Sequence, residues 1–202
     1  MTHTHLLLLG FPDLSEEAYW EVVHALERNP QHPWPPRQML WLAAYRDQEG
    51  WLRVAEGYSD PTAINFEVLG QALQACGVAG PKERALFPVT ALAPLDAPAV
   101  ASVPLHQIVV LEARYSQAGR DAYQRVMAHP AIEQFAPHVI VHAGGADEQG
   151  TVQVLNLFPS QEAANQAFAV LGPVFAELHS PAADRQLTGT LIDFRWLAAD
   201  RP

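Results

Sequence analysis

The clearest pattern in the sequence is a series of short apolar runs separated by amphipathic segments. Residues 6–10 and 108–113 have the length of β-strands, and each run is followed by apolar positions at helical spacing. Two strands joined by a turn, a second helix and a last strand then follow in each half. The predicted strands are residues 6–10, 39–45, 51–58 and 86–92 in the first half and residues 108–113, 139–143, 151–158 and 187–196 in the second. The order β, α, β, β, α, β is thus predicted twice.

Capping residues support the predicted helices. Ser15 can cap the first helix, in which Tyr19 and Val22 lie on the apolar face. The second helix of the first half is predicted to carry Pro61 in its first turn, and Ser160 can cap its equivalent.

The two halves also share sequence. The turn at 47–50 matches the turn at 147–150, and the flanking strands align at a constant offset of 100 residues. Repeats of this kind point to stacked copies of one structural unit. We therefore predict a tandem duplication, with one unit over residues 1–96, the other over residues 97–202, and a linker rich in proline and alanine at 94–104.

The predicted strands are apolar on both faces. Residues 6–9, 39–43 and 108–111 contain no alternating polar positions. Helices can cover one face of a sheet, so something else has to cover the other face. We expect an α+β fold of two ferredoxin-like units that pack sheet to sheet, as an intrachain dimeric α/β barrel.

Composition narrows the range of partners. The chain has 202 residues, a formal net charge of −10 and one cysteine. So acidic a protein repels phosphate backbones, which disfavours nucleic acids and anionic membranes as partners. We expect no signal peptide, because the first residues lack a basic segment and their apolar run is short. No apolar run reaches membrane-spanning length, and the expected location is cytoplasmic.

The element order, the two-sided apolar strands and the repeat resemble the dimeric α/β-barrel superfamily, in particular proteins of the antibiotic-biosynthesis-monooxygenase type. The resemblance implies a pocket between sheet and helices, and it implies cofactor-independent oxygenation of phenolic substrates. Haem-degrading members carry an asparagine on the first strand, and the first strands here have none.

Polar residues inside apolar strands are the candidate catalytic groups, because burying them is unfavourable unless they are used or paired. Glu56 and Asn156 occupy the same repeat position, and His142 replaces Leu42. Glu56 and His142 are candidates for proton transfer, and Asn156 for substrate binding. The alternative is that all three are inert, hydrogen-bonded core residues.

Three aromatic residues of the first half, Trp41, Trp51 and Tyr58, are expected to shape a pocket for a small apolar or aromatic ligand. No cofactor and no metal site are predicted, and formation of a homo-oligomer is left open. A second hypothesis also stays open, in which the barrel is a non-catalytic ligand-binding or stress-associated protein.

Overall fold

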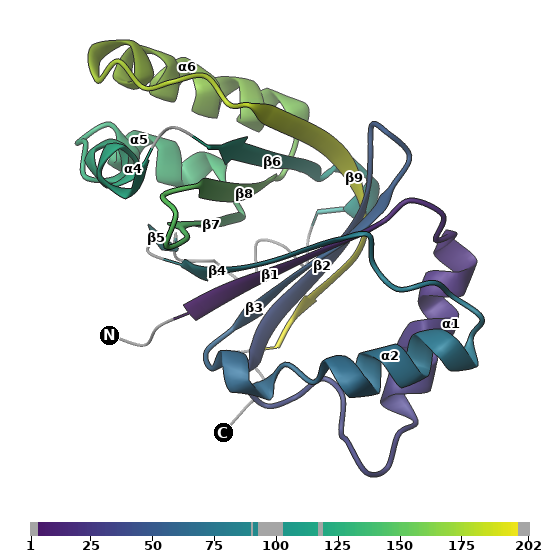
Figure 1. Ribbon diagram of the computed structural model, residues 1–202. Coiled ribbons are helices and arrows are strands. Elements are labelled where there is room, and N and C mark those ends of the chain that lie inside the picture. The colour runs from purple at the N-terminus through teal and green to yellow at the C-terminus, as the bar shows by residue number, and fades with distance from the viewer. Residues whose placement is uncertain (1–3, 90, 93–102, 117–118, 198–202) are drawn as a thin grey trace. The chain divides into compact units, whose positions relative to one another are not determined.

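The computed structural model describes residues 4–89, 91–92, 103–116 and 119–197 (Figure 1). The chain divides into two compact units, the first formed by Met1–Leu86 with Ile192–Pro202 and the second by Phe87–Leu191. The predicted boundary at residues 96 and 97, and most of the predicted linker, lie outside the described residues.

In the first unit, two helices pack on one face of an antiparallel sheet (Figure 1). The elements are β1 (Thr4–Phe11), α1 (Glu16–Glu27), β2 (Met39–Asp47), β3 (Leu52–Tyr58), α2 (Phe66–Ala75) and β4 (Glu83–Val89). The strand order is β4-β1-β3-β2, and the end of β9 (Arg185–Trp196) follows β2.

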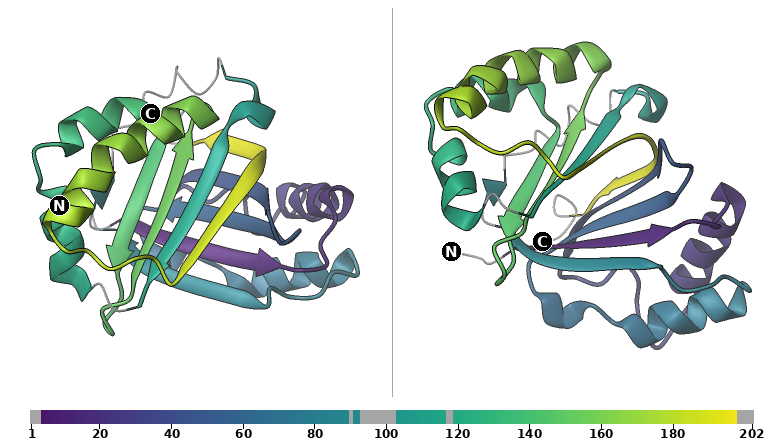
Figure 2. Two further views of the ribbon diagram at one scale, coloured as in Figure 1. Left: turned by 90° about the horizontal axis from the view of Figure 1, so that it is seen from above. Right: turned by 45° about the horizontal axis from the view of Figure 1, so that its top comes forward.

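The second unit repeats this plan, with its helices on one face of the strands (Figure 2). The elements are β5 (Ala91–Leu92), β6 (Val109–Tyr115), α4 (Gly119–Met127), α5 (Ile132–Phe135), β7 (Val141–Ala146), β8 (Val152–Phe158), α6 (Gln161–Glu177) and the start of β9. The strand order is β9-β6-β8-β7-β5. The mixed α+β class predicted from the sequence is confirmed.

The two Asp-x-x-Gly turns are built in the same way. In each turn the aspartate Oδ1 accepts two backbone N–H groups, those of Glu49 and Trp51 for Asp47 and those of residues 149 and 151 for Asp147. Gly50 and Gly150 have φ angles of 85° and 84°, a conformation that favours glycine. The predicted hairpins are confirmed.

Both faces of the central strands are buried. In β1, Leu7 and Leu9 belong to the core beneath the helices, and Leu6 and Leu8 on the opposite face are buried as well. Every residue of β8 is likewise buried. The prediction that the second face is covered is therefore confirmed, while the identity of its cover stays a prediction.

Two elements differ from the prediction in the first half. The second helix does not start at Pro61: residues Pro61–Ala63 form a short 3-10 turn, and α2 begins at Phe66 after its N-cap, Asn65. Asp60 is the N-cap of this turn, and its side chain accepts the N–H of Thr62. The last strand was predicted at residues 86–92. The structure has two strands in this region: β4, which already starts at Glu83, and the short β5.

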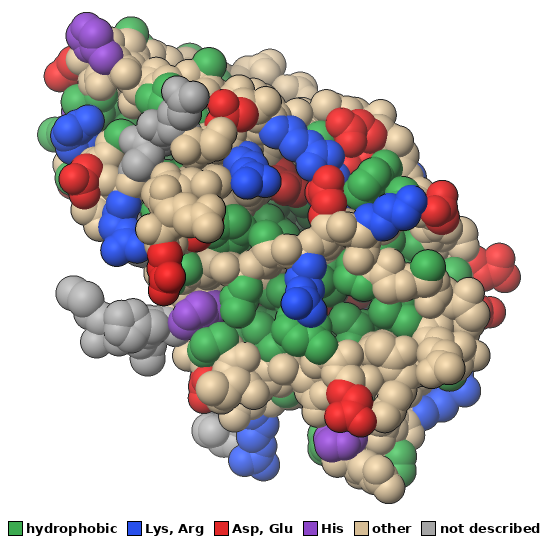
Figure 3. Space-filling model, viewed as in Figure 1, with side chains coloured by type: hydrophobic (Ala, Val, Ile, Leu, Met, Phe, Trp, Pro, Cys, Tyr) green, Lys and Arg blue, Asp and Glu red, His purple; other side chains and the backbone are tan. Residues whose placement is uncertain are grey.

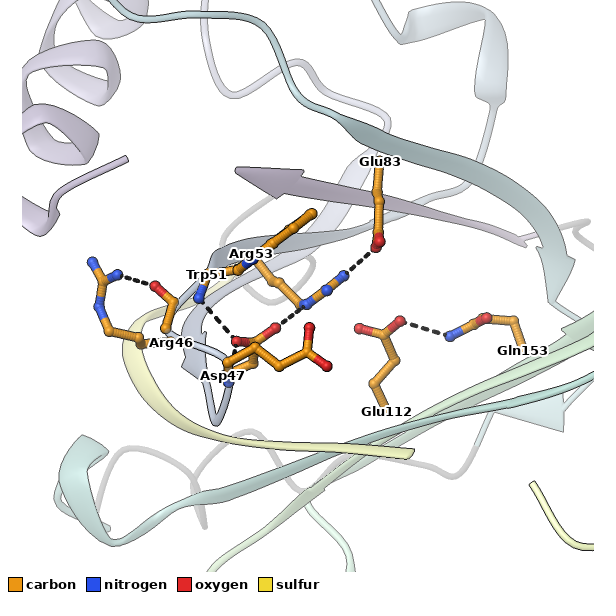
Figure 4. A network of polar contacts seen from close by, with 9 residues as sticks. Arg46, Asp47, Trp51, Arg53, Glu83, Glu112 and Gln153 are labelled. Carbon is orange, nitrogen blue, oxygen red and sulfur yellow. Dashed lines mark hydrogen bonds and ion pairs between the residues drawn. The ribbon is translucent and has the colours of Figure 1, made fainter. Parts of the chain in front are cut away.

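An ion-pair network around the buried Arg53 stabilises the hairpin of the first unit (Figure 4). Arg53 Nε lies 2.6 Å from Asp47 Oδ2, and Arg53 Nη1 lies 2.8 Å from Glu83 Oε2. The network joins the turn to β4. Its members bind one another, so we assign it a structural role.

Lysine and arginine side chains are dispersed among acidic ones on the face shown in Figure 3. No helix in the described part of the chain is long and apolar enough to cross a membrane.

Candidate functional site

The first unit contains a cavity of about 210 Å³ between its sheet and its helices. β3 contributes Glu56 and Tyr58, while Leu7 and Val68 provide apolar walls. The segment between α1 and β2 contributes Trp34. The cavity is thus mostly apolar, with polar groups from β3 and from two loop residues, His32 and Asn65, as is typical of small-molecule sites.

Glu56 and Tyr58 interact directly on this strand. The Tyr58 hydroxyl donates a hydrogen bond of 2.7 Å to Glu56 Oε2, and both side chains are buried. Burial raises the pKa of the Glu56 carboxyl from 4.5 to about 7, although the bond from Tyr58 acts in the opposite direction. Burial and the charge of Glu56 raise the pKa of Tyr58, so its hydroxyl stays protonated. Near neutral pH, Glu56 can therefore both take up and release a proton.

Arg195 of β9 holds Trp34 beside the cavity. Its guanidinium carbon lies 5.3 Å from the centre of the Trp34 ring, in cation–π geometry. The guanidinium also pairs with Glu27 at 2.7 Å and with Asp193 at 3.0 Å. Asp193 in turn accepts a 2.9 Å hydrogen bond from the Tyr19 hydroxyl. This cluster joins α1, β9 and the Trp34 segment.

The second unit has its own pocket between sheet and helices, with a volume of about 70 Å³. The side chains of His142 and Asn156, which are paired across β7 and β8, line it together with Tyr123 of α4. His142 Nδ1 lies 2.7 Å from Asn156 Oδ1, and His142 Nε2 lies 2.9 Å from the Tyr123 hydroxyl. The structure thus brings together two of the predicted site residues, His142 and Asn156. They lie in a different unit from Glu56.

The hydrogen bonds define the protonation state of His142. An amide oxygen only accepts, so Nδ1 carries the proton and Nε2 accepts from Tyr123. Burial lowers the pKa of His142, although its bond to Asn156 acts in the opposite direction. The edge of the Phe135 ring packs against the imidazole at 5.7 Å between ring centres. The imidazole is therefore neutral and fixed in one tautomer.

Gly144 makes room for the Tyr123 hydroxyl. A Cβ at Gly144 would lie 2.7 Å from Tyr123 Cζ and closer still to its hydroxyl oxygen. The equivalent residue of the first half is Ala44, and there the hydroxyl of Tyr19 binds Asp193 instead. Gly144 therefore belongs to the construction of the second pocket.

We expect Gly144→Ala to displace Tyr123 from His142 and to destabilise the second unit by about 1–3 kcal/mol, as overpacked cores do. The measurement is the ¹⁵N NMR spectrum of the imidazole together with urea unfolding. Tyr123→Phe should change the same His142 signals with a smaller loss of stability. An unaltered His142 spectrum in Gly144→Ala would contradict this account of the glycine.

Trp41 and Trp51 lie elsewhere. Trp41 is fully buried, and its indole lies over Gly57. Neighbouring residues of a strand face opposite sides of the sheet, so this indole lies on the face opposite Glu56. Trp51 precedes β3 and stacks with Arg53 at 5.3 Å. Neither residue is among those that line the cavity at Glu56.

Three residues of these pockets were not predicted as functional. These are Tyr123, Trp34 and Gly144, which are not among the site residues predicted from the sequence. The sequence did contain one indication of this pocket. His142 and Gly144, two residues apart on one strand, stand where the first half has Leu42 and Ala44.

Within the described ranges, no group of three or more His, Cys, Asp or Glu side chains is arranged to hold a metal ion. The groups that line the two pockets include Glu56 and Tyr58 in the first and His142, Asn156 and Tyr123 in the second.

Comparison with known proteins identifies the fold. No protein-family profile matches the sequence, and no curated protein is significantly similar to it. A candidate monooxygenase from Fusobacterium nucleatum is similar in structure, with a TM-score of 0.70, 10% identity, and coverage of 96% of this chain and 94% of that one. A candidate monooxygenase from Lactobacillus acidophilus has a TM-score of 0.63 at 10% identity over 96% and 97% of the two chains.

An anthrone oxidase-like protein is also similar, with a TM-score of 0.57 at 13% identity over 98% of this chain and 94% of that one. At these identities the likeness shows the fold. The chain is thus an α+β protein with the fold of monooxygenase-like proteins, and its tandem duplication and closer relationships stay predictions.

Proposed function

We propose that the first unit is a cofactor-independent oxygenase of small phenols, with Glu56 as the catalytic base. The observation that carries the proposal is a buried carboxyl with a pKa of about 7 that lines an apolar cavity of about 210 Å³. A perturbed carboxyl in a cleft is a common sign of acid–base chemistry. The fold, shared with candidate monooxygenases and an anthrone oxidase-like protein, supports the same class of reaction.

The size of the cavity favours small substrates. Pockets for drug-sized molecules measure about 300–1,000 Å³, so a cavity of about 210 Å³ suits one or two rings. Apolar walls and the Trp34 ring would hold the substrate by burial of its rings. We therefore propose one- and two-ring phenols as the substrate class.

The reaction balances without a further reductant. Glu56 takes the phenolic proton, and the phenolate passes one electron to dioxygen. The two radicals combine at the carbon para to the oxygen, and the peroxide takes the proton back from Glu56, which restores the carboxylate. Loss of water, with removal of the ring hydrogen by the same carboxylate, leaves the quinone. One phenol and one dioxygen thus give one quinone and one water.

We also propose that the chain arose by tandem duplication of a ferredoxin-like unit, and that the two sheets cover each other as in a dimeric α/β barrel. The shared strand order and the matching turns support the duplication. Burial of both strand faces supports the sheet-to-sheet packing.

Glu56→Gln is expected to lower kcat/KM for 1-naphthol by about 10²–10⁴-fold, because it removes the base. The measurement is oxygen uptake, with mass spectrometry of the naphthoquinone formed under ¹⁸O₂. The wild-type rate should rise with pH through about 7, as Glu56 ionises, and Glu56→Gln should lack this rise. Tyr58→Phe should shift it to higher pH, because the hydroxyl stabilises the carboxylate.

Glu67→Gln is the matched control, since it removes an exposed carboxylate of α2 outside the residues that line the cavity. Its activity should equal that of the wild type. Equal activity of Glu56→Gln and wild type would refute the role of Glu56. Binding of naphthol without oxygen uptake would favour the alternative, a non-catalytic ligand-binding protein.

A further inference from the structure

The pocket of the second unit presents a hydrogen-bond donor that nothing in the described chain accepts. Asn156 lines this pocket and is only 5% exposed. Its Oδ1 accepts from His142, and no described residue accepts from its amide nitrogen Nδ2. Unlike the fully enclosed unpaired atoms of the described chain, such as Trp41 Nε1, this nitrogen is still reached by solvent, so it is open to a ligand that enters the pocket. We infer that this pocket binds a small neutral carbonyl compound, whose oxygen accepts a hydrogen bond from Asn156.

Tyr123 and His142 act as positioning residues in this site. The Tyr123 hydroxyl donates to His142 Nε2, which leaves the proton on Nδ1. That proton fixes Asn156 Oδ1, so the amide cannot rotate and its Nδ2 group stays directed away from the histidine. The three side chains thus form one chain of hydrogen bonds that ends in the free donor.

The first half shows that the fold does not require this chain of hydrogen bonds. There the residues equivalent to His142 and Gly144 are Leu42 and Ala44, and the same strands form with the same pairing. Leu42 packs into the apolar core of its unit. The same strands thus form without a histidine at this position, which favours a role of His142 in binding.

The walls of the pocket determine which carbonyl compounds fit. The polar side chains that line it are those of Tyr115, Ser180 and the three hydrogen-bonded residues Tyr123, His142 and Asn156. The other lining side chains are apolar, and none of the lining residues is lysine or arginine. A carboxylate would therefore lose its hydration without gaining a cation. The ligand should be neutral, a ketone or an aldehyde.

The volume limits the enclosed part of the ligand. A cavity of about 150 Å³ holds benzene, whereas this pocket measures about 70 Å³. It can enclose the carbonyl group and a few carbon atoms. The rest of the ligand would lie along Phe168, which is 37% exposed, and Phe175.

Acetophenone labelled with ¹³C at its carbonyl is a suitable probe, compared with isopropylbenzene and benzoate as matched apolar and charged molecules. Binding is measured by NMR titration of the full chain, followed at the signals of His142 and Asn156, so that binding in the cavity at Glu56 is recorded separately. We expect acetophenone to bind at least tenfold more tightly than either comparison molecule. Its carbonyl stretching band should move to lower wavenumber in the infrared spectrum of the complex.

Asn156→Asp tests the donor directly. Aspartate keeps an oxygen for His142 but has no N–H to offer, so the preference for acetophenone and the infrared shift should both disappear. Asn165→Asp, the same change on the exposed face of α6, should leave both unaltered. His142→Leu and Tyr123→Phe should weaken binding and broaden the carbonyl band, because the amide is then free to rotate.

Equal affinity for acetophenone and isopropylbenzene would overturn the inference, as would an unchanged carbonyl shift in Asn156→Asp. The folding of each variant is checked by circular dichroism. These outcomes are independent of oxygen uptake at Glu56, so the two proposals can fail separately.

Discussion

Gly57→Ala is expected to destabilise the first unit by about 3 kcal/mol, the upper end of the usual range for overpacking. A Cβ at this position would lie 2.5 Å from Trp41 Cε2 and closer still to Nε1. Trp41 is paired with Gly57 across β2 and β3 and is 0% exposed, so the ring has no free space to enter. The unfolding midpoint in urea should fall accordingly.

Tryptophan fluorescence reports on this unit alone, because all five tryptophans of the chain lie in it. Gly70→Ala is the matched control. Gly70 lies in α2, and a Cβ added there would have nothing within 4 Å, so alanine should stabilise the unit by about 0.5–1 kcal/mol. Replacement of glycine by alanine is thus expected to lower the stability of the unit at position 57 and to raise it at position 70.

A double-mutant cycle identifies the cause. Trp41→Leu alone should be destabilising because it leaves a cavity. When Trp41→Leu and Gly57→Ala are combined, the added methyl group partly fills that cavity, so the loss of stability should be smaller than the sum of the two single losses. Additive losses would show that Gly57 is required for a reason other than the indole of Trp41.

The same pair of positions illustrates what the sequence could predict. In the second half, Val141 and Leu157 replace Trp41 and Gly57, and they too are paired across the hairpin. The first half thus pairs a large side chain with a glycine, and the second half pairs two side chains of medium size. Both pairs are buried. The repeat and the strand pairing could be predicted, because the lengths of the apolar runs and the turn residues between them determine which strands form each hairpin.

The composition of the pockets was harder to predict. Glu56 and Tyr58, like His142 and Asn156, were predicted as site residues and come together as pairs. The partner of His142 was missed because Tyr123 comes from a helix that precedes it by 19 residues. Whether a helical tyrosine directs its hydroxyl to a strand or to Asp193, as Tyr19 does, depends on tertiary packing.

The helix start at Pro61 was wrong for a related reason. Asp60 followed by proline is a good helix N-terminus by local preference. Asn65 is a second capping residue five positions later, and its side chain accepts the N–H of Val68. Two competing caps in one segment cannot be ranked from local sequence, because packing of the helix on the sheet decides between them.

The two halves differ in the charge of their pockets. The repeat position on β3 and β8 holds a carboxyl that titrates near neutrality in one unit and an amide in the other. The carboxyl can exchange a proton with a ligand, whereas the amide can only orient one. This difference accounts for assigning oxygenation to the first unit and binding of a neutral carbonyl compound to the second.

Glu56→Gln is expected to stabilise the first unit at pH 8 by up to about 3 kcal/mol while it removes activity. The pKa of Glu56 rises from 4.5 in the unfolded chain to about 7 in the folded one, and each unit corresponds to about 1.4 kcal/mol. The folded state thus binds the proton more tightly, so stability falls as pH rises through this window. Below pH 4.5 both states are protonated and the contribution of Glu56 is fully present.

Glutamine resembles the protonated carboxyl and cannot ionise, so the variant should lack this decline. The measurement is urea unfolding of wild type and Glu56→Gln between pH 4 and pH 9, followed by tryptophan fluorescence. The difference between the two proteins should be small at pH 4 and grow up to about pH 7, with little change beyond. Glu67→Gln should show no such growth, because that carboxyl is exposed. A difference between wild type and Glu56→Gln that is the same at every pH would mean that Glu56 ionises equally well in the folded and unfolded chains, and it could then not serve as a base tuned to neutral pH.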